Sequence, residues 1–282
     1  MTDGDVSAPG RAGGLAAPSA ESTAGQVAMV ALLEAQSRRA PRGRIARFFG
    51  VSPLNHETHA LYRGVVGEIE VGEALDRLPS EWVVRHALPV DEGLADIDHL
   101  VIGPAGVFIV TTTNHNGLGV WASQRTLMVG GIRQPHIRNM EYEMGRAERM
   151  LSTAAGSAVQ VSGILAVVAA KSLVVREKHR DVAVLSATNI VSWLVRHKRV
   201  LSPAEVSHIG TAASLASTWN PGDTIDLQPL RLRQQFESLR AEVRRAWRVQ
   251  LTWAISISAL GVGAFGGITY AILMSAIGSF GI

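Results

Sequence analysis

The feature that most restricts how this chain can fold is its C-terminal stretch, residues 249–282, which contains no Asp, Glu, Lys, Arg or His. A helix that crosses a bilayer needs roughly 20 mostly apolar residues, and buried helices of soluble proteins are seldom so long. The stretch suffices for one crossing but is too short for two crossings and a turn. We therefore expect one C-terminal transmembrane helix over residues 249–282, with a buried soluble helix as the alternative.

The residues before this stretch indicate its orientation. The basic residues there are Arg231, Arg233, Arg240, Arg244, Arg245 and Arg248. Only Glu237 and Glu242 oppose them, and nothing charged follows the stretch. The positive-inside rule then places residues 1–248 in the cytoplasm. The predicted localisation is the cell membrane, crossed once, with a cytoplasmic N-terminal domain.

Two patterns along the C-terminal helix predict that it self-associates. Small residues that would let two helix backbones approach closely recur every four positions, at Ala259, Gly263, Gly267, Ala271 and Ser275. An apolar seam of coiled-coil type precedes them, formed by Leu232, Phe236, Leu239, Val243 and Ala246. The expected partners of this helix are therefore the membrane and a second copy of the chain, although ordinary packing also produces such stripes.

The N-terminal 60 residues divide into a tail, a helix and a basic linker. Residues 1–25 contain almost no large apolar side chains, so we expect them to be disordered. Residues 26–60 are expected to form a short helix and an arginine-rich linker. The linker arginines, which precede two phenylalanines, are Arg38, Arg39, Arg42, Arg44 and Arg47. They suit contact with anionic lipid or nucleic-acid phosphate, and a solvated linker is the plainer interpretation.

Residues 61–219 alternate between helix-type and strand-type patterns, which is typical of an α/β domain with a mixed sheet. Helices are expected over residues 65–78 and 137–151, and two more close the domain. Strands are expected over residues 82–90, 97–102, 107–113, 120–129, 159–169, 173–175 and 181–185. Ser202-Pro203-Ala204-Glu205 is a capping box that begins the last helix. Residues 220–248 are expected to be a linker and a basic juxtamembrane helix.

The composition excludes several kinds of chemistry. The chain has no cysteine, which excludes disulfides and cysteine-ligated zinc or iron–sulfur sites. The net charge of +3 gives no sign of bulk affinity for nucleic acid. Lysine occurs only at Lys171, Lys178 and Lys198. No glycine-rich loop of the P-loop or dinucleotide-binding type is present.

The most informative segment runs from residue 64 to residue 151. It contains Gly67-Glu68, then the strand sequence Asp-Ile-Asp-His-Leu-Val-Ile-Gly-Pro that begins at Asp96, then a Gly-Val-Phe strand that begins at Gly106. This combination resembles the nuclease-related (NERD) domain, and residues 159–219 look like the less specific downstream part of its actinobacterial members. The resemblance implies the restriction-endonuclease-like PD-(D/E)xK superfamily fold, in which helices flank a mixed sheet.

The resemblance also implies a set of site residues. That superfamily needs an aspartate on one strand, and an acidic residue and a lysine two positions apart on the next, where both face the same side. The carboxylates hold Mg²⁺, and the lysine helps to position and activate water. Carried over to this sequence, Glu68 is the helix carboxylate and Asp98 the strand aspartate. The acid and lysine positions fall on Thr111 and Thr113.

These two threonines argue against catalysis. Thr111 offers Mg²⁺ no negative charge, and Thr113 offers the transition state no positive charge. Residues 1–170 contain no lysine as a substitute, and an arginine stays protonated and cannot act as a base. We therefore expect no enzymatic activity and no cofactor. Glu68 and Asp98 would bind a metal, Mg²⁺, only if the chain were an active nuclease.

Two histidines suggest a different metal site. His99 and His115 would approach each other if their strands paired as a hairpin, and Asp98 would be the third ligand. Neighbours along a strand point to opposite faces, however, so Asp98 and His99 do not easily share a metal. Surface histidines, or hydrogen-bonded core histidines, are the favoured interpretation.

Three functions from different classes remain open. The favoured one is a catalytically degenerate nuclease-like module at the membrane that binds or scaffolds a nucleic-acid or protein partner. The second is a metal-dependent nuclease with a rearranged active site. The third is a membrane-organising protein that self-associates. The sequence identifies no particular partner.

Overall fold

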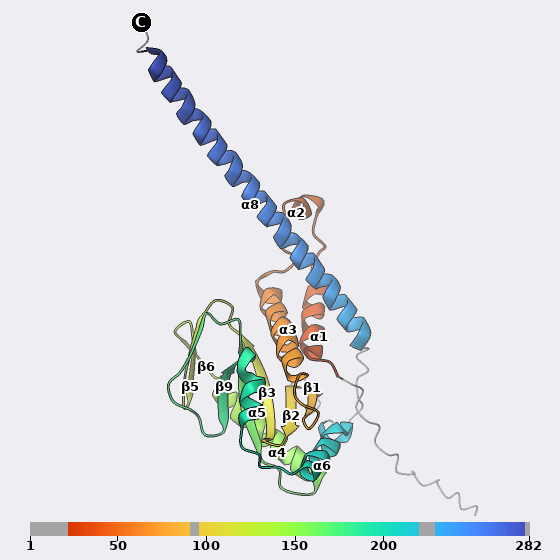
Figure 1. Ribbon diagram of the computed structural model, residues 1–282. Helices are drawn as coiled ribbons and strands as arrows, with labels where there is room; N and C mark the ends of the chain where they lie inside the picture. The colour runs from red at the N-terminus through yellow and green to blue at the C-terminus, as the bar shows by residue number, and fades with distance from the viewer. Residues whose placement is uncertain (1–21, 91–95, 220–228, 280–282) are drawn as a thin grey trace, which may run out of the picture. The chain divides into compact units, whose positions relative to one another are not determined.

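A computed structural model describes residues 22–90, 96–219 and 229–279 of the chain (Figure 1). The chain divides into two compact units. The α/β unit comprises Met1–Val27 and Gly64–Leu227, and the helical unit comprises Ala28–Arg63 and Gln228–Ile282. The predicted disordered tail, residues 1–25, lies almost entirely outside the described residues.

The α/β unit is built on a five-stranded mixed sheet with the strand order β1-β2-β3-β7-β9. Its strands are β1 (Val83–Pro89), β2 (Asp96–Gly103), β3 (Gly106–Asn114), β7 (Val161–Val168) and β9 (Val182–Ser186). The first three strands are antiparallel neighbours, whereas β3 and β9 both run parallel to β7. The strands expected from the sequence are confirmed here within a few residues.

A second mixed sheet, with the order β6-β5-β4-β8, was not expected. Its strands are β4 (Gly119–Ser123), β5 (Thr126–Val129), β6 (Ile132–Gln134) and β8 (Ser172–Val175). β3 and β7 turn together into β4 and β8, which again pair in parallel. The turns use positive φ angles, 75° at Gly117 and 53° at Ala169, and the Gly117 N–H donates to the Ala169 carbonyl. One predicted sheet is therefore two.

Helices cover both faces of the five-stranded sheet. The residues of α3 (His56–Leu75) from Gly64 onward pack with α5 (Ile190–Arg196) on one face, through a cluster that includes Val71, Leu75 and Phe108. On the other face lie α4 (His136–Ala155), α6 (Pro203–Ser214) and α7 (Ala216–Trp219). A 3₁₀ turn, η1 (Ala187–Asn189), precedes α5.

Two sequence signals for helices are confirmed in detail. The predicted apolar stripe of α4 is buried, at Ile137, Met140, Met144, Ala147 and Leu151. In the capping box of α6, the Glu205 N–H donates to Ser202 Oγ and the Ser202 N–H donates to the Glu205 carboxylate. This helix ends at Ser214 rather than near residue 219, because Leu215 adopts an extended conformation that separates α7.

The helical unit consists of α1 (Gln26–Ser37) from Ala28 onward, α2 (Arg44–Phe48), the first turns of α3, and α8 (Pro229–Ser279). Its buried apolar side chains are Met29, Leu32, Leu54, Leu232, Phe236, Leu239 and Ala246. The Tyr62 ring lies 5.9 Å from the Phe236 ring. Most of the predicted coiled-coil seam is thus buried within the chain itself.

The structure gives the predicted transmembrane helix no support. Among the residues that the structure describes, no helix is sufficiently long and apolar to cross a membrane. The backbone of the predicted span, residues 249–282, is described as far as Ser279, but its side chains beyond residue 259 are not, apart from that of Ile268. The small-residue positions Gly263, Gly267 and Ala271 are among them, whereas Ala259 is exposed.

Candidate functional site

Asp98 lies at a break in the ladder between β2 and β3. The paired register begins at His99, which lies opposite Val110, and continues to Gly103. Beyond this end the half-buried Asp98 side chain accepts the next hydrogen bond from β3. The backbone N–H of Thr112 donates to Asp98 Oδ2 across 2.7 Å. On the other side of β2, the register with β1 skips Ala87, whose φ is 47°. The carboxylate therefore replaces a main-chain hydrogen bond of the sheet.

Thr111 and Thr113 lie on the face of β3 that packs against α4. The Thr111 hydroxyl donates to Glu143 Oε2 on α4 at 3.1 Å. Thr113 is 7 % exposed, and its hydroxyl has no hydrogen-bond partner among the residues that the structure describes. Their shared face agrees with their spacing of two residues. Neither threonine, however, is the acid or the base that the resemblance requires at its position.

Glu68 is carried by the helix on the opposite face of β3. A Cβ at Gly67 would lie 3.1 Å from Thr112 Cγ2 and 3.6 Å from Asn114 Cβ. The backbone of α3 therefore rests directly on the face of β3 that carries Thr112 and Asn114, and glycine permits this approach. The four site residues expected from the sequence are thus divided between the two faces of the sheet and the break at Asp98.

Sequence reasoning missed Glu143, which brings a carboxylate to the acid position from another element. Glu143 is half-buried, and burial raises its pKa while the Thr111 hydrogen bond and Arg146 oppose this rise. A signal was present, because Glu143 lies three residues after Met140 and four before Ala147 of the buried stripe. A carboxylate at that helical position faces inward.

Glu143 lines a cleft of about 460 Å³ on the α4 face. Its lining residues are Val90, Ile97, Arg138, Asn139, Tyr142, Glu143 and Arg146. Arg146 lies over the ring of Tyr142, 5.8 Å from its centroid. The cleft thus combines one carboxylate with two guanidinium groups. Within the described part of the chain, no group of three His, Asp or Glu residues could hold a metal ion.

The histidines do not form the alternative metal site. His99 is fully buried, with its Nδ1 2.8 Å from Nδ1 of His86, and burial and then His86 hold its pKa well below the usual value. His86 Nε2 lies 3.1 Å from Asp76 Oδ1. The ring of His115 lies 5.8 Å from that of His136.

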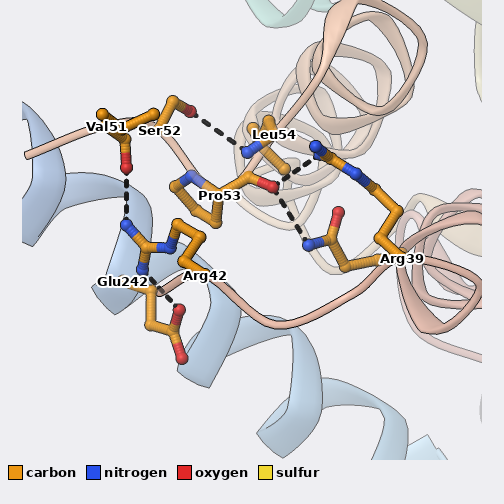
Figure 2. A network of polar contacts seen from close by, with 8 residues as sticks. Arg39, Arg42, Val51, Ser52, Pro53, Leu54 and Glu242 are labelled. Atoms are coloured by element: carbon orange, nitrogen blue, oxygen red, sulfur yellow. Dashed lines mark hydrogen bonds and ion pairs between the residues drawn. The ribbon is translucent and has the colours of Figure 1, made fainter. Parts of the chain in front are cut away.

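The arginine-rich segment of the helical unit is only partly free to meet a ligand. Arg39 Nη1 donates to the Pro53 carbonyl at 2.7 Å. Arg42 donates to the Val51 carbonyl at 2.6 Å and pairs with Glu242 of α8 at 2.8 Å (Figure 2). Arg38 is exposed and lies 3.8 Å from Glu34, and Arg44 and Arg47 are also exposed. Two of the five arginines, Arg39 and Arg42, therefore already bind groups of the chain itself.

These features define a mixed α/β protein in which the carboxylate of Asp98 lies at the junction of two strands. Residues 63–168, from within α3 to the end of β7, match the family model of the nuclease-related domain, NERD. The resemblance carried by Gly67-Glu68 and the Asp98 strand is confirmed for this segment, which is a little over a third of the chain. No curated protein and no solved structure matches the chain.

Proposed function

We propose that the chain is a catalytically degenerate nuclease-related module, of the PD-(D/E)xK superfamily and actinobacterial type, that binds a nucleic-acid or protein partner without cleaving it. The observation that carries this proposal is the hydrogen bond from the Thr112 N–H to Asp98. It engages the remaining strand carboxylate in the sheet, while threonines stand at the acid and lysine positions.

The residues present do not fit a magnesium ion at this site. Mg²⁺ prefers near-octahedral oxygen ligands with carboxylates among them. Thr111 is neutral and donates its hydroxyl proton to Glu143, and the Thr113 hydroxyl is buried and neutral. Glu68 is on the helix that covers the other face of β3. No catalytic step through a metal is therefore derived.

A titration of the chain, purified in detergent, with Mg²⁺ and with Mn²⁺ tests this proposal. Calorimetry should detect no saturable binding by the wild-type chain. Asp98→Asn is the matched control, because it keeps an oxygen that accepts from the Thr112 N–H while it removes the charge. Saturable binding by the wild type that disappears in Asp98→Asn would contradict the proposal.

The second candidate, a nuclease with a rearranged active site, has one specific observation in its favour. Glu143 places a carboxylate 3.1 Å from the Thr111 hydroxyl, in a cleft that also holds Arg138 and Arg146. This candidate requires metal binding that depends on both Asp98 and Glu143. In the same titration, Glu143→Gln would then abolish binding as Asp98→Asn does.

Membrane attachment is part of the proposed function. Its support is in the sequence: residues 249–282 carry no charge, and arginines precede them. The chain would cross the cell membrane once, with residues 1–248 in the cytoplasm. Topology reporters fused to either end test this: a C-terminal reporter active only in the cytoplasm, or a chain that stays soluble without detergent, would overturn it.

A further inference from the structure

Large apolar side chains are exposed together around α2 in the helical unit. They are Ile45, Phe48, Phe49 and Val51, with exposed fractions of 75 %, 61 %, 52 % and 48 %. Scattered single apolar residues are normal at a protein surface, whereas four within seven residues, two of them in ring contact, indicate a site of interaction. We call these four residues, together with Trp253 of α8, the α2 patch.

The α2 patch has a defined structure that is fixed to α8. The ring centroids of Phe48 and Phe49 lie 5.2 Å and 5.5 Å from that of Trp253. The indole N–H of Trp253 donates to the Phe48 carbonyl at 3.0 Å. Gly50 has a φ of 70°, and a Cβ there would lie 2.6 Å from the Ala246 carbonyl oxygen, so only glycine permits this contact.

The hydrogen bonds of Arg42 fix Val51, the last residue of the segment that carries the α2 patch. Arg42 donates to the Val51 carbonyl and pairs with Glu242 on α8, as Figure 2 shows. The exposed aromatic rings are therefore presented on an ordered surface and do not project from a loose loop.

The charges around the α2 patch are positive. No Asp or Glu occurs from residue 35 to residue 56, or after Glu242. Arg44 and Arg47 are exposed beside the apolar residues, whereas Arg42 is neutralised by Glu242. Basic side chains are attracted to anionic lipid headgroups, and aromatic rings favour the headgroup level of a bilayer.

The patch also adjoins the start of the uncharged stretch. On α8 the large apolar side chains that are exposed within four residues of Trp253 are Leu251, Ile255 and Ile257. Aliphatic side chains such as Ile45 and Val51 gain little from a nucleic acid, because they neither stack on bases nor bind phosphate. They gain from leaving water for lipid.

We propose that the α2 patch lies in the interface of an anionic phospholipid membrane. The side chains of Ile45, Phe48 and Phe49 enter the boundary between headgroups and acyl chains, and Arg44 and Arg47 bind the lipid phosphates. This inference rests on the membrane attachment in the proposed function. It adds a second contact with the bilayer, which fixes the helical unit at the surface.

The absence of cysteine permits a direct test, because a single introduced thiol carries a spin label at one position. The full chain would carry it at Ile45→Cys, or at Leu230→Cys as the matched control. Leu230 is also apolar and is 80 % exposed, and at 1.5 Å per residue it lies about 35 Å along α8 from Trp253. Collisions of the label with oxygen and with a water-soluble nickel complex are measured in vesicles.

In vesicles of phosphatidylcholine with phosphatidylglycerol, the label at residue 45 should show a several-fold loss of nickel collisions and a gain of oxygen collisions. The label at residue 230 should remain accessible to nickel. Arg44→Gln with Arg47→Gln should return the label at 45 toward water, whereas Arg38→Gln should not, because Arg38 already lies beside Glu34.

Each other outcome overturns the inference. A chain that floats with vesicles while the label at 45 stays aqueous refutes the patch but leaves membrane attachment intact. A chain that does not float refutes both. If the label at residue 45 enters vesicles of phosphatidylcholine alone to the same depth, the patch does not prefer anionic lipid. Protection of the label by a DNA oligonucleotide and not by vesicles identifies nucleic acid as the ligand.

Discussion

The backbone N–H of Thr112 donates to the Asp98 carboxylate at 2.7 Å, at the point where the β2–β3 ladder ends. A charged acceptor makes this hydrogen bond stronger than an ordinary main-chain one. The residue that resembles the metal-binding aspartate of a nuclease is thus part of the sheet. Its role in stability can be separated from any role in chemistry.

Asp98→Ala should destabilise the α/β unit by about 1–3 kcal/mol, because it leaves the Thr112 N–H without an acceptor. Asp98→Asn retains an acceptor oxygen and should cost less. The free energy of unfolding is measured by chemical denaturation of the two variants and the wild type. An Asp98→Ala variant as stable as the wild type would show that the hydrogen bond contributes nothing.

The raised pKa of Glu143 predicts that the free energy of unfolding depends on pH. Burial raises its pKa above the ordinary value of 4.5, so the folded state retains its proton where the unfolded state has lost it. The stability that the protonated form contributes is fully present below pH 4.5 and is lost as the pH rises through the folded pKa. Glu143→Gln should flatten this part of the profile.

Thermal denaturation across that pH range tests the Glu143 prediction. Glu148→Gln, on the exposed side of the same helix, is the matched control and should leave the profile unchanged. If the stability of the wild type and of Glu143→Gln changed in parallel with pH, Glu143 would not be the titrating group.

Two glycines of α3 should respond differently to replacement by alanine. Gly64→Ala has open space around the new Cβ, so it should stabilise the helix by up to about 1 kcal/mol. Gly67→Ala should lose this gain, because its Cβ would lie 3.1 Å from Thr112 Cγ2. Unfolding experiments on both variants compare them directly, and equal gains would contradict the close packing of α3 on β3.

Self-association through Ala259, Gly263, Gly267 and Ala271 stays a prediction from the sequence. Gly263→Ile together with Gly267→Ile should weaken a dimer in detergent, because the larger side chains keep the two helix backbones apart. Analytical ultracentrifugation in detergent measures this, with Ile268→Leu as the volume-conserving control. An unchanged oligomeric state in the double variant would exclude this face as an interface.

Local periodicity predicted most of the fold. The apolar stripe of α4 and the capping box at Ser202 depend on neighbours within a few residues, so the sequence alone was sufficient for both. The division into two sheets was not predictable in this way. It depends partly on a left-handed conformation at Ala169, which alanine seldom adopts and which no local pattern signals.

The site was less predictable than the fold because its contacts are distant in sequence. The resemblance identified Asp98, Thr111 and Thr113, but not the hydrogen bond from Thr112 that engages Asp98. Glu143 reaches Thr111 from 32 residues away. Similarly, the burial of the seam that contains Phe236 depends on packing partners that no local pattern indicates.

A cleavage assay on the full chain, with DNA and RNA substrates and with Mg²⁺ or Mn²⁺, shows directly whether the chain is a nuclease. We predict no cleavage above that of Asp98→Asn, which serves as the control for contaminating nuclease because it retains the acceptor for Thr112. Wild-type cleavage that is lost in Asp98→Asn would show that the chain is not degenerate but a nuclease with a rearranged active site.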